Sequence, residues 1–211
     1  MDLDTHLDTA IQSLSGPLIP ISDAPSIVPP KPGLYAIYGD ASVWSTLSVT
    51  STVEGGPLYV GKSEDSLLAR EVFTHFNASP TRKPATGSST VRRSFAALLR
   101  AELQLQGQAR NPLKPANFAS YGLAGDGDKR LTEWMAENLQ LAVWVKPDLP
   151  GLALSDIESH VIRHWDPPVN IDKAPTSRRE LKALRAALAR EARERARRKV
   201  FSSIETKADW A

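Results

Sequence analysis

The chain has 211 residues, of which 41% are hydrophobic and five are tryptophan, so one domain with extensions can bury a core. It contains no cysteine, which excludes disulfides and thiolate metal sites. No apolar run approaches the ~18 residues of a membrane span. The acidic start at residues 1–4 is also unlike a secretory signal. We therefore expect a cytoplasmic protein that does not contact membranes.

The net charge of +2 is unevenly distributed along the chain. Residues 178–199 hold ten Lys or Arg and three Asp or Glu, a balance of +7, which leaves −5 for the remainder. Such a segment is either a solvated charged helix or a surface that binds phosphates with release of counterions.

In the first third of the chain, Leu3, Leu7 and Ile11 recur at helical spacing, and six of the sixteen prolines fall within 16–32. The expected elements are a helix at 2–14, an extended connector at 16–32, a strand at 33–39, a long hairpin connection at 39–56 with a short strand at 46–53, and a second strand at 57–61.

The remainder alternates helices with one clear strand, in which Leu141, Val143 and Val145 recur at every second position. The expected elements are a helix capped by Ser63, a helix at 90–106, a short strand near 118–121, a helix at 131–139, a strand at 140–146, a helix at 151–165 and a long helix that begins at the capping box 177–180.

This order predicts an α+β fold with a small, mainly antiparallel three-stranded central sheet flanked by helices, with helical extensions at both ends. We expect three segments: an N-terminal helix and connector at 1–32, a central domain at 33–172, and a basic helical extension at 173–211.

Two tyrosines lie in the first two expected strands, in the strings Gly33-Leu34-Tyr35 and Leu58-Tyr59-Val60-Gly61-Lys62. If these strands pair, both phenols can project from one face. The alternative is that the tyrosines only pack there, because tyrosine favours strands. Gly61 suits a strand end where the backbone bends or approaches a ligand.

Glu158 lies at the edge of the apolar stripe of the helix at 151–165. A partly desolvated carboxylate in this position requires a cation. Alternatively, Ser155 and Glu158 have the spacing of a capping box, in which the glutamate bonds the helix N-terminus. His160 and His164 have the spacing of a zinc pair, but Val161 stands where the zinc-protease motif has glutamate. We expect these histidines at the surface or facing nucleic acid.

Taken in order over residues 33–171, these residues resemble the GIY-YIG nucleases, which cut nucleic acid with one divalent metal ion. The resemblance adds Arg70 and then His75 on the helix after the second tyrosine, and an asparagine after a proline, matched by Pro168-Val169-Asn170. The spacing of five between Arg70 and His75 departs from the family's commoner four and turns His75 about 140 degrees away in a regular helix.

The resemblance implies a role for each matched residue. Tyr35 is the general base, Tyr59 orients the water or phosphate, Lys62 lowers the phenol pKa, Arg70 compensates phosphate charge, His75 supports Tyr35, Asn170 braces the site, and Glu158 is the only protein ligand of Mg²⁺ or Mn²⁺. The chemistry is coherent, because a phenol with a pKa near ~10 becomes a base only beside positive charge.

Further basic residues are candidates for binding nucleic acid. Arg92 and Arg93 open a helix, where phosphates bind readily, and the last helix begins with a basic run. The candidates are Arg92, Arg93, Arg178, Arg179, Lys182 and Arg185.

The expected function is a metal-dependent endonuclease that hydrolyses phosphodiester bonds, with double-stranded DNA as substrate. The alternatives are a nucleic-acid-binding module that keeps the fold without turnover, or a structural protein that binds partners through its flanking helices. Cutting both strands with one site per chain favours a homodimer. The apolar stripe that includes Leu3 or the one that includes Leu181 either forms the dimer seam or packs back on the domain.

Overall fold

A computed structural model describes residues 3–70, 76, 86–110, 118–148 and 151–208. The chain forms two compact units, each built from two separate stretches of sequence. Unit 1 comprises Met1–Pro84 and Thr132–Arg178, and unit 2 comprises Ala85–Leu131 and Arg179–Ala211. This division differs from the three consecutive segments expected from the sequence. The expected central segment, 33–172, supplies residues to both units, because compactness depends on contacts between distant parts of the chain.

Unit 1 contains an antiparallel sheet with the strand order β1-β6-β2-β3. The strands are β1 (Ile19–Pro20), β2 (Gly33–Gly39), β3 (Tyr59–Ser63) and β6 (Leu139–Val145). The predicted α+β fold with an antiparallel sheet is confirmed. The sheet contains the three expected strands and a fourth, β1, which lies in the proline-rich connector. Pro20 is tolerated there because β1 is an edge strand.

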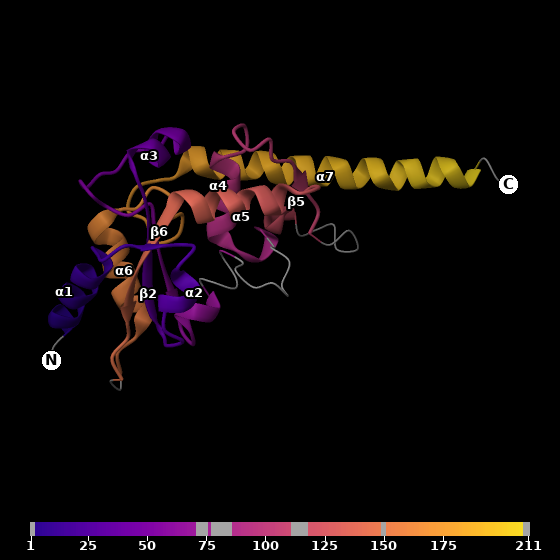
Figure 1. Ribbon diagram of the computed structural model, residues 1–211. Helices are drawn as coiled ribbons and strands as arrows, with labels where there is room; N and C mark the ends of the chain where they lie inside the picture. The colour runs from indigo at the N-terminus through magenta and orange to yellow at the C-terminus, as the bar shows by residue number, and fades with distance from the viewer. Residues whose placement is uncertain (1–2, 71–75, 77–85, 111–117, 149–150, 209–211) are drawn as a thin grey trace. The chain divides into compact units, whose positions relative to one another are not determined.

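Two helices, α1 (Leu3–Leu14) and α6 (Leu154–Trp165), pack on one face of this sheet and contact each other (Figure 1). Their apolar stripes meet alternate residues of the strands, among them the fully buried Leu34 and Val60. The hydroxyl of Tyr38 donates a hydrogen bond of 2.6 Å to the carbonyl of Leu14. This core fixes α6, and therefore Glu158, against the sheet.

The segment between β2 and β3 is helical where a hairpin connection was expected. Helix α3 (Ala41–Leu47) follows β2, and the expected strand at 46–53 is absent. Asp40 caps this helix by accepting a hydrogen bond of 3.0 Å from the Val43 amide. Val43 and Leu47, four residues apart, are both buried. The N-cap and this buried apolar turn stabilise a helix, although the Ser/Thr-rich composition favours a non-helical connection. The connector also contains the short helix α2 (Ala24–Ile27).

Unit 2 is formed mainly by α4 (Thr90–Leu98) and α7 (Arg179–Ala208), the long yellow helix in Figure 1. Its smaller elements are η2 (Thr86–Ser88), β4 (Gly107–Gln108), η3 (Phe118–Ser120), β5 (Gly122–Leu123) and the first residues of α5 (Gly127–Asn138). The strand expected near 118–121 is a 3-10 helix followed by β5, and the helix expected at 90–106 ends at Leu98.

Leu181 and Leu188 of α7 are buried. A Cβ added to Gly107 in β4 would lie 2.1 Å from the Leu188 carbonyl oxygen, so strand and helix pack backbone to backbone. Helix α7 contacts β4, α4 and η3 of its own unit. In the part of the chain that the structure describes, no helix is long and apolar enough to cross a membrane.

Candidate active site

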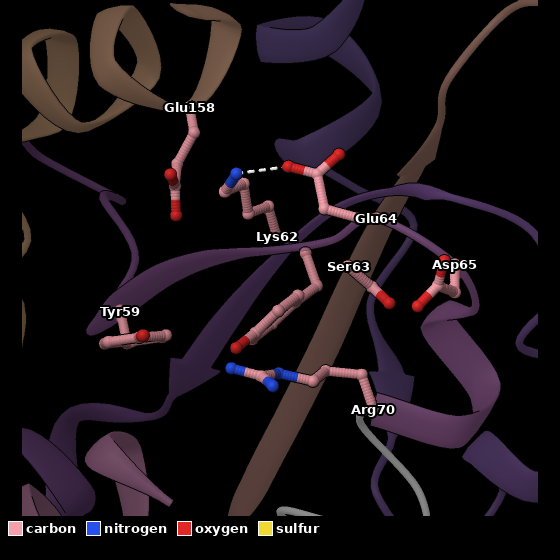
Figure 2. A pocket seen from close by; sticks show the side chains of 8 residues that line it. Tyr59, Lys62, Ser63, Glu64, Asp65, Arg70 and Glu158 are labelled. Atoms are coloured by element: carbon pink, nitrogen blue, oxygen red, sulfur yellow. Dashed lines mark hydrogen bonds and ion pairs between the residues drawn. The ribbon is translucent and has the colours of Figure 1, made fainter. Parts of the chain in front are cut away.

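A cavity of about 350 Å³ lies at the β3 edge of the sheet in unit 1. Figure 2 shows Glu158 projecting from α6 toward Tyr59 and Lys62 of β3. The lining residues are Tyr35, Tyr59, Lys62, Ser63, Glu64, Asp65, Arg70 and Glu158. Five of the seven expected catalytic residues are among them, although positions 35 and 158 are far apart in the sequence.

The two tyrosines lie on the same face of the β2–β3 pair. Tyr35 pairs with Gly61, and Ile37 pairs with Tyr59, so alternation places both phenols on one side. Their ring centroids are 6.0 Å apart, with an interplanar angle of 35°. A Cβ on Gly61 would lie 2.4 Å from the Tyr35 hydroxyl oxygen. The buried phenol of Tyr35 thus occupies space that only glycine leaves open.

Glu158 does not cap its helix. Helix α6 begins at Leu154 with Ala153 as N-cap residue, and no side chain bonds that end. The Glu158 carboxylate instead accepts a hydrogen bond of 2.5 Å from the Lys173 ammonium, which also donates to the Ser155 carbonyl at 3.1 Å. The Glu158 side chain is only 12% exposed. A largely desolvated carboxylate requires a cation, and in this structure Lys173 is the cation that pairs with Glu158.

The sequence contains no signal that would have identified Lys173. It lies in the irregular segment after α6 with φ +64°, a left-handed conformation that non-glycine residues rarely adopt. Neither periodicity nor a motif spacing reports such a contact, because it depends on the path of the chain back along α6.

Two further cations border the cavity. Lys62 forms an ion pair with Glu64, marked by the dashed line in Figure 2. Arg70 is exposed and extends its guanidinium into the pocket from the helical residues that follow β3 (Figure 2). The expected Ser63 cap is observed as a hydroxyl that accepts from the Ser66 amide at 3.1 Å. The cavity therefore combines phenols, cations and one partly buried carboxylate.

Asn170 supports the edge strand β3, which carries Tyr59. Its side-chain oxygen accepts from the Val60 amide, and its side-chain nitrogen donates to the Val60 carbonyl, both at 2.8 Å. The Val169 amide adds a hydrogen bond of 3.0 Å to the Leu58 carbonyl. The segment after α6 thus covers the outer edge of β3 and pairs the backbone groups beside Tyr59.

Among the described residues, no histidine lines this cavity. His75 lies outside the described residues. His160 is exposed, with its Nδ1 2.9 Å from the Asp156 carbonyl oxygen, and His164 stacks edgewise on Trp165. Within the described ranges no three His, Cys, Asp or Glu side chains gather in a way that could hold a metal ion.

Two of the expected nucleic-acid-binding residues are internal. Arg92 is fully buried and pairs with Asp128 at 3.3 Å, while Arg178 is 11% exposed and pairs with Asp166. A buried guanidinium requires acceptors from the fold itself, so neither residue presents a surface to phosphate. Of the remaining candidates, Arg179 and Lys182 are exposed, and Arg93 and Arg185 are half-buried.

The residues of the cavity fit a single divalent ion. Mg²⁺ and Mn²⁺ prefer oxygen ligands, and Mg²⁺ retains several waters when one carboxylate binds it. Glu158 is a carboxylate that already binds a cation at the rim of an open cavity, and no second protein carboxylate is required.

The chain matches the GIY-YIG catalytic domain family over residues 36–187, well over half of its length. Tyr35 precedes this segment by one residue, and the other residues lining the cavity lie within it. No curated protein and no solved structure matches the chain significantly. The cavity and its sheet are therefore those of a protein that belongs to the GIY-YIG nuclease family, whose substrates are nucleic acids.

Proposed function

We propose that this protein is a divalent-metal-dependent endonuclease that hydrolyses phosphodiester bonds of DNA in the cavity at the edge of β3. The observation that carries the proposal is the convergence of Tyr35, Tyr59, Arg70 and Glu158 on one cavity of about 350 Å³. Such a volume admits a phosphodiester group with its attacking water.

In this mechanism Glu158 holds Mg²⁺ or Mn²⁺, which supplies charge compensation for the phosphate and the leaving oxygen. Tyr35 accepts the proton of the attacking water. Tyr59, whose ring lies beside that of Tyr35, orients the water or the phosphate. Lys62 stabilises the phenolate form of Tyr35 that takes up this proton, and Arg70 stabilises the negative charge that develops on the phosphate oxygens.

For the substrate we propose double-stranded DNA. With one cavity per chain, cleavage of both strands requires two chains, so a homodimer belongs to the same proposal. Leu181 and Leu188 of α7 are already buried within a single chain, so the seam of such a dimer would use other residues.

One observation favours an alternative, a nucleic-acid-binding module without turnover. The Lys173 ammonium neutralises Glu158, the carboxylate that the metal requires. In an enzyme, Lys173 must yield this position when the metal binds. In a binding module it stays there, and the two functions are separated by a cleavage assay.

The decisive test is cleavage of supercoiled plasmid DNA with Mg²⁺ or Mn²⁺, compared with EDTA. We expect nicking or linearisation only with the metal. Glu158→Gln should lower the rate by about 10²- to 10³-fold, because it removes the charge that holds the metal. Glu137→Gln is the matched control, since Glu137 is an exposed glutamate of α5 and loses the same charge. Equal rates for the two variants would refute the role of Glu158.

A further inference from the structure

Charge divides between the two units far more sharply than the net charge suggests. Unit 2 contains 17 Lys or Arg and 8 Asp or Glu, a balance of +9, whereas unit 1 contains 9 and 16, a balance of −7. A polyanionic substrate is repelled by the unit that holds the cavity and attracted by the other one. Unit 2 is therefore where binding of nucleic acid outside the cavity should be sought.

Within unit 2, arginines gather around the carbonyl of Gly87. Arg93 of α4 and Arg110 both donate to this oxygen, at 2.9 and 3.3 Å. Arg185 of α7 approaches the same side of α4, with 3.5 Å between its Nη1 and the Ser94 hydroxyl. Three guanidiniums thus lie close together.

Two observations show that this cluster is not fully compensated by the fold. Burial, followed by repulsion from Arg185 and Arg110, lowers the pKa of Arg93. The Arg93 Nε is buried and has no hydrogen-bond partner. Among the described residues, no ion pair joins Arg93 or Arg110 to a carboxylate. In the described part of this unit, Asp128 pairs with Arg92, Glu191 with Arg100, and Asp126 with Arg130.

The cluster continues into a groove of about 390 Å³ between α7 and η3, which Arg185 also lines. Arg190 and Arg193 border the groove, and the small Ala186 and Ala189 also line it. The Arg193 guanidinium carbon lies 5.1 Å from the centre of the Phe118 ring. Guanidinium forks that are oriented by stacking are suited to phosphate oxygens, and small residues leave room for a sugar.

We propose that the groove formed by Arg185, Arg190, Arg193 and Phe118, together with the adjacent Arg93, binds the sugar–phosphate backbone of a nucleic-acid strand. It does so apart from the cavity in which the phosphodiester is cut. This inference rests on the proposed nuclease function and assigns the backbone contacts of its substrate. From Arg185 to Arg193, α7 rises about 12 Å, a length that covers three to four base-pair steps of a duplex.

The test is binding of a fluorescently labelled 20-base-pair duplex and of the corresponding single strand to the full chain in EDTA, which separates binding from cleavage. The double substitution Arg185→Gln and Arg193→Gln is compared with Arg197→Gln and Arg198→Gln. The control arginines are exposed on the same helix, do not line the groove, and lose the same charge.

We expect the groove variant to bind at least tenfold more weakly than the control variant. We also expect it to lower the slope of log affinity against log salt by about two, one for each lost phosphate contact. Equal weakening by the two double variants would overturn the proposal and indicate diffuse attraction to α7. Arg190→Gln, at an exposed groove position, repeats the test if the half-buried Arg185 proves necessary for folding, as judged by thermal unfolding.

Two further experiments test whether the groove binds a small anion instead of a nucleic-acid strand, and whether the proposed nuclease function holds. Inorganic phosphate at 1 to 5 mM, about the level at which a lone phosphate site would fill, should not displace the duplex. If it does, the groove is a small-anion site and the proposal is wrong. Plasmid cleavage with Mg²⁺ is measured in parallel. Binding that depends on the groove without any cleavage would refute the nuclease function and retain the groove. Cleavage by the protein, together with equal binding by both double variants, would retain the nuclease function and refute the groove.

Discussion

Gly61 shows how one residue without a side chain shapes the cavity. It lies opposite Tyr35 in the β2–β3 ladder, and the phenol crosses the space that a Cβ would fill. The sequence suggested only that the backbone bends or meets a ligand at Gly61. The structure shows why glycine is required: Tyr35 and Gly61 are paired in the ladder, and the phenol fills the space next to the Gly61 backbone.

Gly61→Ala is expected to reduce cleavage by about a hundredfold while the protein stays folded, because a displacement of ~1 Å at a reacting group has that effect. The added methyl group would lie 2.4 Å from the Tyr35 hydroxyl oxygen and must push the phenol aside. Plasmid cleavage and circular dichroism measure the two quantities. Gly122→Ala is the control, because its Cβ meets nothing closer than 3.8 Å. Unchanged cleavage by Gly61→Ala would show that the Tyr35 position is not critical.

Lys173 and a divalent ion compete for the same carboxylate. Lys173→Gln should therefore strengthen binding of Mn²⁺ by about two- to fivefold, because an ion pair whose lysine side chain is 35% exposed contributes up to about 1 kcal/mol. Isothermal titration calorimetry with Mn²⁺ measures the change without relying on activity. Lys146→Gln removes the same charge elsewhere in unit 1 and should leave Mn²⁺ affinity unchanged. Weaker Mn²⁺ binding by Lys173→Gln would mean that Lys173 positions Glu158 for the metal.

At the scale of elements, β3 is an edge strand whose outer side is occupied by the segment after α6. An exposed edge is a hazard for aggregation, and here the Asn170 side chain acts as a short substitute for a neighbouring strand. The same contact ties the end of α6 to the strand that carries Tyr59. Sheet edge and site are thus stabilised together.

Asn170→Ala should lower the free energy of unfolding by about 3 kcal/mol, because it leaves both backbone groups of Val60 without their partner at a buried position. Urea denaturation measures this loss. Asn138→Ala, which removes one hydrogen bond to the helix carbonyl of Trp134, should cost clearly less. Equal losses for the two variants would show that the edge contact adds no stability beyond one ordinary hydrogen bond.

Element boundaries also show where local reasoning fails. The Ser/Thr-rich composition of 39–56 indicated a hairpin connection, whereas the Asp40 cap and the buried Val43 and Leu47 make a helix. Apolar residues four apart are visible in the sequence. Whether these residues are buried depends on a surface that the rest of the fold supplies, and the composition of the segment does not reveal that surface.

At the scale of the whole molecule, both units contain a buried tyrosine that donates to a backbone carbonyl. Burial raises the pKa of Tyr38 to about 12, and burial also raises the pKa of Tyr121. In the unfolded chain both phenols ionise near ~10. The folded state holds these protons more tightly, so the resulting stability is complete below pH 10 and is lost as the pH rises from 10 toward 12.

The melting temperature should therefore be constant up to about pH 9.5 and fall above pH 10. Differential scanning calorimetry across this range checks the prediction. Tyr38→Phe should start from a lower melting temperature, because it loses the hydrogen bond to Leu14, and should decline less steeply above pH 10. An equally steep decline would assign the alkaline loss to other groups.

The sequence by itself determined the order of chemical groups and the type of fold. Tyr35, Tyr59, Arg70 and Glu158 were identifiable because their types and their order along the chain resemble the GIY-YIG nucleases, and residue type and order are local or linear properties. Tertiary structure alone decided that these side chains share a cavity, that Lys173 binds Glu158, and that Arg92 is buried in an ion pair. It also decided that the chain divides into an acidic and a basic unit, each built from distant segments. These features depend on distances between residues far apart in the sequence, which only the packing of the folded chain sets.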